Sequence, residues 1–303
     1  MNRELNDSIA KDSIYRMAKS NIKLSKGDLT VELLPEFGGR ISSIRIAGCE
    51  EWITQPQDEL VPRFPGDIFI RPEISGWDEM VPTTDACISF SDEKELPDHG
   101  EIWARSWDVI AESTDSAVMS IELDVRTLKF SRGISLFELP NNRYQIDLDY
   151  KLQNVGLVST PAFWSCHPMF RGEDVKSVSV RSKKPLIQTA PESPAVAQTF
   201  LPLDLPKGKS IEYWCEVDDE IESMDILRNN GEVLSFEWDK AEIPYFGIFI
   251  DNHEFCRAEV ISPQPAIAYK VSERSAEIAG LIPLLAPQAI QQWKLSIFLD
   301  RAI

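Results

Sequence analysis

Short runs in which apolar and polar residues alternate recur along the chain from residue 22 onward. In LTVELLP, for example, Leu29, Val31 and Leu33 alternate with Thr30 and Glu32. A period of two places successive side chains on opposite faces of an extended strand, so each run predicts a strand with one buried face. The later runs include AVMSIELDV, GISLFEL, YQIDLDYKLQNV, SVSVRS, YFGIFID and WKLSIFL.

Turn-forming sequences separate these runs, and helical periodicity is nearly absent. The turn signals include PEFGG, PNNR, RNNGE and DNHE, and only residues 272–279 (SERSAEIA) fit a short helix. Many strands without intervening helices predict an all-β fold, a large antiparallel sandwich or barrel with few short helices. Residues 189–209 and 262–288 hold many of the prolines, and we expect long loops there.

The chain contains no sequence that would divide it into separate domains. Its 303 residues show no fixed repeat, no low-complexity tract and no linker. All-β domains often exceed 200 residues, so one large domain is expected. We predict a tail or short helix over residues 1–20 and a single β-sandwich domain over residues 21–303.

The charge and cysteine content restrict the partners and the compartment. The formal net charge is −18, which repels nucleic acid and anionic membranes, so we expect neither as a partner. No segment approaches 18 uncharged apolar residues, and MNRELNDSIAKD has charges where a signal peptide needs an apolar run. The five Cys are widely spaced without CxxC, which is typical of reduced thiols. We therefore expect a cytoplasmic protein.

Two of the three histidines lie in segments that suit a ligand site. His99 precedes Gly100, which permits a positive φ or a close backbone approach, in a loop where a ligand could bind. The alternative is an ordinary loop histidine bonded to Asp98 or Glu101. His167 ends the apolar strand FWSCHP and could act as a general acid, because imidazole titrates near working pH. It could also be a core histidine satisfied by one hydrogen bond.

Two adjacent acids, Asp78 and Glu79, follow Trp77 in ISGWDEMVPT. Carboxylates beside an aromatic ring suit sugar recognition, because they accept from hydroxyls while the ring covers the apolar face of the sugar. A solvated acidic turn is the alternative interpretation.

No motif supports a metal or a nucleotide cofactor. Cys166 and His167 are neighbours on a predicted strand, so their side chains diverge, and no other spacing fits a metal site. There is also no GxSxG, GxGxxG or P-loop. We expect neither a metal nor a cofactor.

Taken together and in order, four stretches resemble the aldose 1-epimerase (galactose mutarotase) superfamily. They are LLPEFGGRISSI, ISGWDEMVPT, LPDHGEIWARSW and FWSCHPMFRG, and WKLSIFL resembles the closing strand of that family. The resemblance spans residues 22–303. It implies a β-supersandwich with a sugar groove on one face of a large sheet. It also implies an activity, the interconversion of the α and β anomers of a hexose by acid/base ring opening.

The resemblance also implies roles for individual residues. His99 would position the sugar, and His167 would be the general acid that protonates the ring oxygen. The family uses a Glu just before a Pro as the base at the anomeric hydroxyl, but RAEVISPQPAIAY has Ser262 or Gln264 before its prolines. Glu259 is the nearby acid and hence the candidate base, although strand parity places it on the opposite face from Ser262.

We therefore expect an isomerase that acts on a free sugar. The catalytic candidates are His167, His99 and Glu259, and the sugar-binding candidates are Arg71, Asp78, Glu79 and Gln264. Two alternatives remain open: a non-catalytic carbohydrate-binding or sensor protein on the same fold, and an interaction protein with a vestigial groove. Whether the sugar is phosphorylated is also open, since Arg40, Arg71 and Arg105 could together bind a phosphate. So is the oligomeric state, for which a homodimer is one option.

Overall fold

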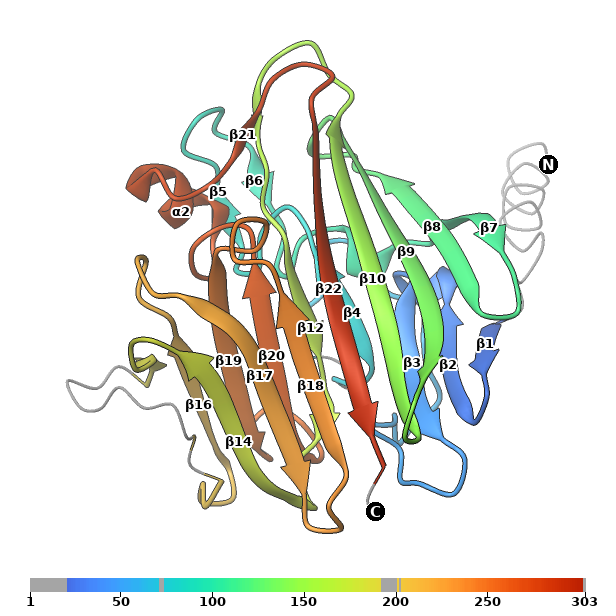
Figure 1. Ribbon diagram of the computed structural model, residues 1–303. Helices are drawn as coiled ribbons and strands as arrows, with labels where there is room; N and C mark the ends of the chain where they lie inside the picture. Colours follow the sequence, from blue (N-terminus) through green and yellow to red (C-terminus); the bar gives the residue numbers. More distant parts are fainter. Residues whose placement is uncertain (1–20, 71–73, 192–200, 202, 302–303) are drawn as a thin grey trace, which may run out of the picture.

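Two large antiparallel sheets pack face to face (Figure 1). The computed structural model describes residues 21–70, 74–191, 201 and 203–301. Within these residues strands dominate, and α2 (Glu273–Ala279) is the single α-helix, so the predicted all-β class and the short helix are both confirmed. The predicted tail over residues 1–20 lies outside the described residues. No helix in the described part of the chain is long and apolar enough to cross a membrane.

The first sheet has ten strands and contains strands from three of the four segments that resemble the mutarotase motifs, LLPEFGGRISSI, ISGWDEMVPT and FWSCHPMFRG. Its order is β1 (Ile22–Lys26), β2 (Leu29–Leu34), β3 (Arg40–Ile46), β4 (Trp77–Met80), β12 (Ser165–Pro168), β20 (Glu259–Ala266), β19 (Tyr245–Asn252), β16 (Lys209–Trp214) and β15 (Ile187–Ala190), while β13 (Phe170–Arg171) also pairs with β20.

The second sheet has eight strands. Its order is β14 (Val175–Ser182), β17 (Ile221–Arg228), β18 (Val233–Trp238), β22 (Ile290–Asp300), β10 (Arg143–Asn154), β9 (Leu128–Leu139), β8 (Ser116–Glu122) and β7 (Asp108–Glu112). Two short pairs, β5 (Cys87–Ile88) with β6 (Glu95–Leu96) and β11 (Thr160–Pro161) with β21 (Leu284–Leu285), and the 3-10 turns η1 (Pro35–Phe37) and η2 (Ile102–Ala104) complete the described elements.

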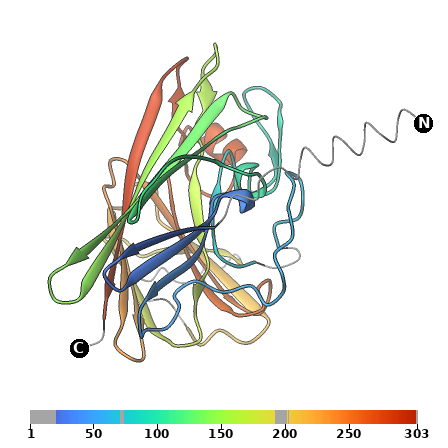
Figure 2. The same ribbon diagram turned by 90° about the vertical axis from the view of Figure 1, so that its right-hand side faces the viewer.

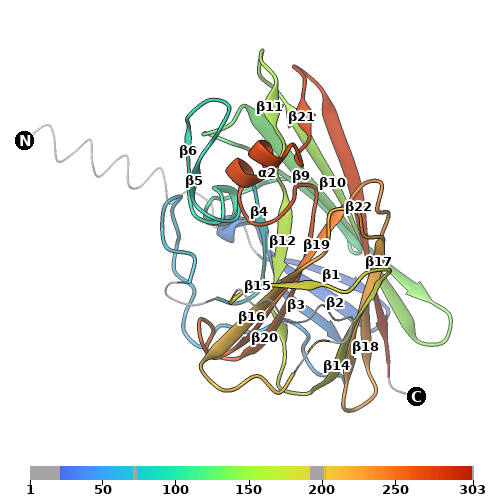
Figure 3. The same cartoon turned by 90° about the vertical axis from the view of Figure 1, so that its left-hand side faces the viewer.

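The main core lies between the two sheets because each strand turns its alternate apolar residues inward. Leu148 and Leu152 of β10, and Ile297 and Leu299 of β22, are fully buried there. Each such side chain contributes about 1.5–3 kcal/mol relative to exposure. The views in Figures 2 and 3 place β5, β6 and α2 on the other side of the ten-stranded sheet, away from the eight-stranded one. This outer face of the ten-stranded sheet is where the candidate site lies.

The expected loop over residues 262–288 is wrong in its first part, because β20 continues to Ala266 through Pro263 and Pro265. Prolines two residues apart direct their missing N–H groups to the same neighbouring strand. The ladder between β20 and β19 is continuous, whereas β12 pairs with β20 only at Ser165. The missing N–H donors therefore face β12, and the pairing with β19 holds β20 in the sheet.

Candidate functional site

His167 lies in a row of side chains that crosses the outer face of the ten-stranded sheet. The pairing of β12 with β4 places Asp78 beside His167. On the other side, the register shared by β12, β13 and β20 places Gln264 beside His167. Val260, on the same face of β20 as Gln264, packs with Met169 in a small outer cluster rather than in the main core. The row therefore faces outward, and on the β20 side of His167 it carries the amide of Gln264 rather than a carboxylate.

The rings of His99 and His167 meet on this face, although they come from distant parts of the sequence. Their centroids are 5.3 Å apart and the rings are nearly perpendicular. Phe69 stacks flat on His99 at 3.9 Å and meets His167 edge-on at 5.2 Å. The two imidazoles are thus close enough to contact one sugar ring. A pair of histidines beyond joint reach of one sugar would have favoured the interaction protein with a vestigial groove, and that separation is not observed.

A strained turn presents His99. His99 has φ +56° and Gly100 has φ +73°. Positive φ is uncommon for a residue with a side chain and tends to occur at functional sites. Gly100 is also required for space, since a Cβ there would lie 2.1 Å from the carbonyl oxygen of Val81. The backbone N–H of His99 donates to the Thr84 carbonyl at 2.5 Å. The positive φ and close approach predicted for Gly100 are both confirmed.

The carboxylate of Asp98 holds both the His99 ring and its stacking partner. Asp98 Oδ1 lies 3.0 Å from His99 Nδ1, and Asp98 Oδ2 accepts from the Phe69 backbone N–H at 3.3 Å. Burial raises the pKa of Asp98, but the hydrogen bond and charge of His99 outweigh it and bring that pKa below its ordinary value. Asp98 is therefore ionised at neutral pH.

His167 is buried and lacks a fixed partner. Only 6% of the residue is exposed, and its Nδ1 has no hydrogen-bond partner among the described residues. Burial, and secondly the charge of His99, hold the pKa of His167 well below its ordinary value of 6.5. The ring is neutral at neutral pH.

Of the two adjacent acids, only Asp78 belongs to the outer face. It is 1% exposed and bound in a bidentate pair by Arg40, through Nε to Oδ1 at 2.9 Å and Nη2 to Oδ2 at 2.6 Å. Glu79 points into the core, where it accepts from Arg132, Tyr150 and Trp164 at 2.8–3.0 Å. Its predicted place in the sugar site is wrong, because neighbouring residues on a strand point to opposite faces.

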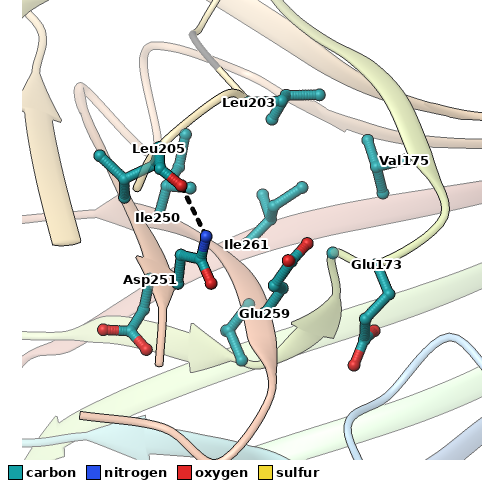
Figure 4. A pocket seen from close by; sticks show the side chains of 11 residues that line it. Glu173, Val175, Leu203, Leu205, Ile250, Asp251, Glu259 and Ile261 are labelled. Carbon is teal, nitrogen blue, oxygen red and sulfur yellow. Dashed lines mark hydrogen bonds between the residues drawn. The ribbon is translucent and has the colours of Figure 1, made fainter. Parts of the chain in front are cut away.

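Glu259, the candidate base, is not brought to His167. It lies at the start of β20 on the opposite face from Gln264. There it lines a cavity of about 170 Å³ together with Glu173, Ile250 and Ile261 (Figure 4). This cavity is separate from the histidine pair. Glu259 therefore has no contact through which it could take a proton from a sugar held by His99 and His167.

Of the three arginines considered for a phosphate, the two that the structure describes are each bound by carboxylates. Arg105 is bound by Glu101 at 3.1 Å and Asp124 at 3.2 Å, whereas Arg40 is bound by Asp78. Arg71, also a sugar-binding candidate, lies outside the described residues. Among the residues that the structure describes, no group of three or more His, Cys, Asp or Glu could hold a metal ion.

Sequence reasoning missed several residues of this face. Phe69 lies in the loop FPGDIFI and carried no signal, because an apolar residue in a loop is common. Trp214 lies over Gly247, the β19 residue opposite Gln264, where an added Cβ would approach the indole to 2.5 Å. Trp214 is therefore the next side chain in the row beyond Gln264, because Gly247 between them has none. The sequence carried a signal only for the contact between Asp98 and His99, which are neighbours in the chain.

Comparison with known proteins identifies the fold. No family model and no curated protein matches this chain in sequence. Among solved structures, a galactose mutarotase-like protein from Lactobacillus casei superposes with a TM-score of 0.69 at 15% identity, covering 93% of this chain and 100% of that one. A protein from Synechocystis superposes with a TM-score of 0.70 at 12% identity, and the superposition covers 92% of this chain and 95% of that one. A galactose mutarotase related enzyme from Lactobacillus acidophilus gives 0.66 at 14% identity, covering 93% and 98%.

The chain thus has the galactose mutarotase-like fold. The superfamily resemblance carried by the four sequence motifs is confirmed at the level of the fold.

Proposed function

We propose that this protein is an aldose 1-epimerase-like isomerase. It would bind a free aldose against the outer face of the ten-stranded sheet and interconvert the α and β anomers. The proposal rests mainly on the closeness of His99 and His167, whose ring centroids are 5.3 Å apart on that face. The mutarotase names of the structural neighbours agree with it.

The reaction needs two proton transfers at neighbouring oxygens of the sugar. A base takes the proton of the anomeric hydroxyl O1, and an acid protonates the ring oxygen O5 as the C1–O5 bond breaks. The aldehyde then turns about C1–C2 and the ring closes on its other face. Both oxygens are bonded to C1, so two imidazoles side by side can serve them. Each positioned acid or base is worth about 10²–10⁴-fold in rate.

The neighbours of the pair suit hydroxyl recognition. Gln264 is buried on this face, and its amide can both donate and accept a hydrogen bond. Asp78 accepts two hydrogen bonds from Arg40, and this pair keeps the row beside His167 polar. A sugar over this row would lie between His167 and the indole of Trp214.

Polarimetry or NMR of freshly dissolved α-glucose and α-galactose tests the activity. We expect the protein to accelerate anomer equilibration and His167→Ala to lose about 10²-fold or more of that rate. His253→Asn is the matched control, because His253 lies in the turn after β19 with φ +61° and outside the row. A protein that leaves the buffer rate unchanged for these sugars, with His167→Ala indistinguishable from it, contradicts the proposal for them.

A non-catalytic carbohydrate-binding or sensor protein is the second candidate. The observation that favours it is Gln264 beside His167, where a carboxylate base would be expected. Calorimetric titration showing sugar binding without turnover would support it. Gln264→Glu, or Ser262→Glu, should then create activity by supplying the base, and Gln264→Asn is the uncharged control. If neither Glu variant turns over sugar, the missing carboxylate does not explain the inactivity.

A further inference from the structure

We infer that Asp98 is a positioning residue that fixes His99 as the proton donor of the pair and leaves His167 as the proton acceptor. This assignment deepens the proposed function and rests on it. It also reverses the roles that the superfamily resemblance implies, in which His167 is the acid and His99 only holds the sugar.

The first step is the tautomer of His99. An ionised carboxylate can only accept a hydrogen bond, so Asp98 Oδ1, at 3.0 Å, places a proton on Nδ1 of His99. The atom of His99 that remains for a ligand is therefore Nε2. With Nδ1 already protonated, Nε2 donates when the ring is charged.

The second step is the rigidity of this arrangement. The buried indole of Trp103 donates to the carbonyl of Asp98 at 3.1 Å and to that of Gly100 at 3.0 Å, so it holds the backbone on both sides of His99. Phe69, held by Asp98 Oδ2, covers one face of the imidazole. The ring is thus oriented before any ligand binds, which is what an efficient acid requires.

The third step is where the charge resides. Two imidazoles at 5.3 Å do not readily both become positively charged, because like charges at this range repel. The carboxylate lies at His99, whereas Nδ1 of His167 has no partner and the neighbouring Asp78 is bound by Arg40. The pKa of His167 is held low first by its burial and then by the charge of His99, which agrees with His167 as the neutral partner of the pair.

Among the residues that the structure describes, Asp85 and Arg63 are further charged groups near the pair. Burial raises the pKa of Asp85, and the charge of His99 opposes that rise. The Arg63 guanidinium lies 5.8 Å from the centre of the Phe69 ring. Its Nη1 lies 3.8 Å from Oδ2 of Asp78. Asp85 favours charge on His99, and Arg63 is compensated by Asp78, so neither reverses the assignment.

The proton balance closes without a carboxylate base. His99 Nε2–H gives its proton to O5 as the C1–O5 bond breaks. The proton of O1 passes to His167, and the electron pair of the O1–H bond forms the C1=O1 double bond. On closure O5 returns its proton to His99, and His167 returns its proton to O1. No Glu before proline is needed, which accounts for Ser262 and Gln264 in those positions.

Asp98→Asn tests the assignment by turnover. The amide keeps the size of the side chain but removes its charge. We expect kcat to fall about 10²-fold with little change in KM, and the alkaline limb of the kcat–pH profile to move to lower pH. Asp149→Asn is the matched control, because Asp149 is exposed on the second sheet. An Asp98→Asn enzyme with the kcat and pH profile of the unmodified protein overturns the assignment while leaving the proposed function standing.

NMR of the imidazole nitrogens gives a readout that needs no turnover. The chain has only three His, so three ring systems are observed and can be assigned with His99→Gln and His167→Gln. We expect the proton of neutral His99 on Nδ1, and a loss of that preference in Asp98→Asn. A proton on Nε2 in the unmodified protein refutes the role of Asp98. If the unmodified protein does not accelerate mutarotation, the proposed function and the proton-transfer roles fail together, and the tautomer alone decides whether Asp98 positions His99.

Discussion

Asp78 and Glu79 are neighbours in the chain, yet their carboxylates lie on opposite faces of β4. Asp78 pairs with Arg40 on the outer face, and Glu79 pairs with Arg132 of β9 between the sheets at 2.9 Å. Both carboxylates are almost fully buried. One short strand therefore anchors two buried ion pairs, one beside the candidate site and one in the core behind it.

Replacing the core arginine should be strongly destabilising. In Arg132→Met, Glu79 remains buried without its cation, and we expect the free energy of unfolding in urea to fall by about 3–5 kcal/mol. Burial raises the pKa of Glu79 against the opposing effect of Arg132, so part of the loss will be relieved by protonation. The double variant Arg132→Met with Glu79→Leu should recover much of the stability. A loss below about 1 kcal/mol in the single variant would contradict the importance of this pair.

Gly100→Ala should destabilise the protein more than Gly208→Ala does. Both Gly100 and Gly208 have positive φ, but a Cβ on Gly208 meets nothing within 4 Å, whereas one on Gly100 meets the Val81 carbonyl at 2.1 Å. Gly208→Ala should cost about 1–2 kcal/mol for its backbone conformation alone. Gly100→Ala should cost about 1–3 kcal/mol more through the clash. Equal midpoints in urea unfolding would show that the turn at His99 can relax.

His167 should make the stability of the protein depend on pH in the range below 6.5, the ordinary pKa of a histidine. The folded protein keeps this ring neutral because its pKa is held well below 6.5, while the unfolded chain takes up a proton. The unfolded state therefore binds more protons, and stability is lost as pH falls below 6.5. His167→Gln should be less sensitive than the unmodified protein between about pH 7.5 and about pH 5.5 in urea unfolding. The control His253→Asn should show the same dependence of unfolding free energy on pH as the unmodified protein.

Glu273 should have the opposite effect in a nearby pH range. Burial, opposed by Arg126, raises the pKa of Glu273 from 4.5 to about 7, so the folded protein binds a proton that the unfolded chain releases. This contribution is complete below pH 4.5 and is lost as pH rises through about 7. Glu273→Gln should remove that part of the pH dependence, whereas the exposed Glu237→Gln should not. Identical slopes for Glu273→Gln and the unmodified protein would contradict the raised pKa.

The strands and the helix could be predicted because their signals are local. The period-two runs became strands, and Ser272 and Gly280 bracket α2 as an N-cap and a left-handed C-cap. The separation of Asp78 from Glu79 was equally predictable, since the parity rule that separates Cys166 from His167 applies to every pair of neighbours on a strand.

The site itself depends on contacts that a single sequence does not record. Gln264 lies beside His167 only because β20 is the strand next to β12, and that choice is made by packing across the whole sheet. The meeting of His99 with His167 likewise depends on how the loop that contains Phe69 folds over the sheet. That the protein is cytoplasmic, and that it forms a homodimer, stay predictions.

The position of Gln264 has a genetic consequence. Codons for Gln and Glu differ only in their first base, so one nucleotide substitution would place a carboxylate on the β20 side of His167. The backbone of β20 need not change, because its pairing with β19 fixes the position whatever the side chain. Under the proposed function, a single mutational event in such a scaffold would exchange a base-assisted site for a site served by two imidazoles.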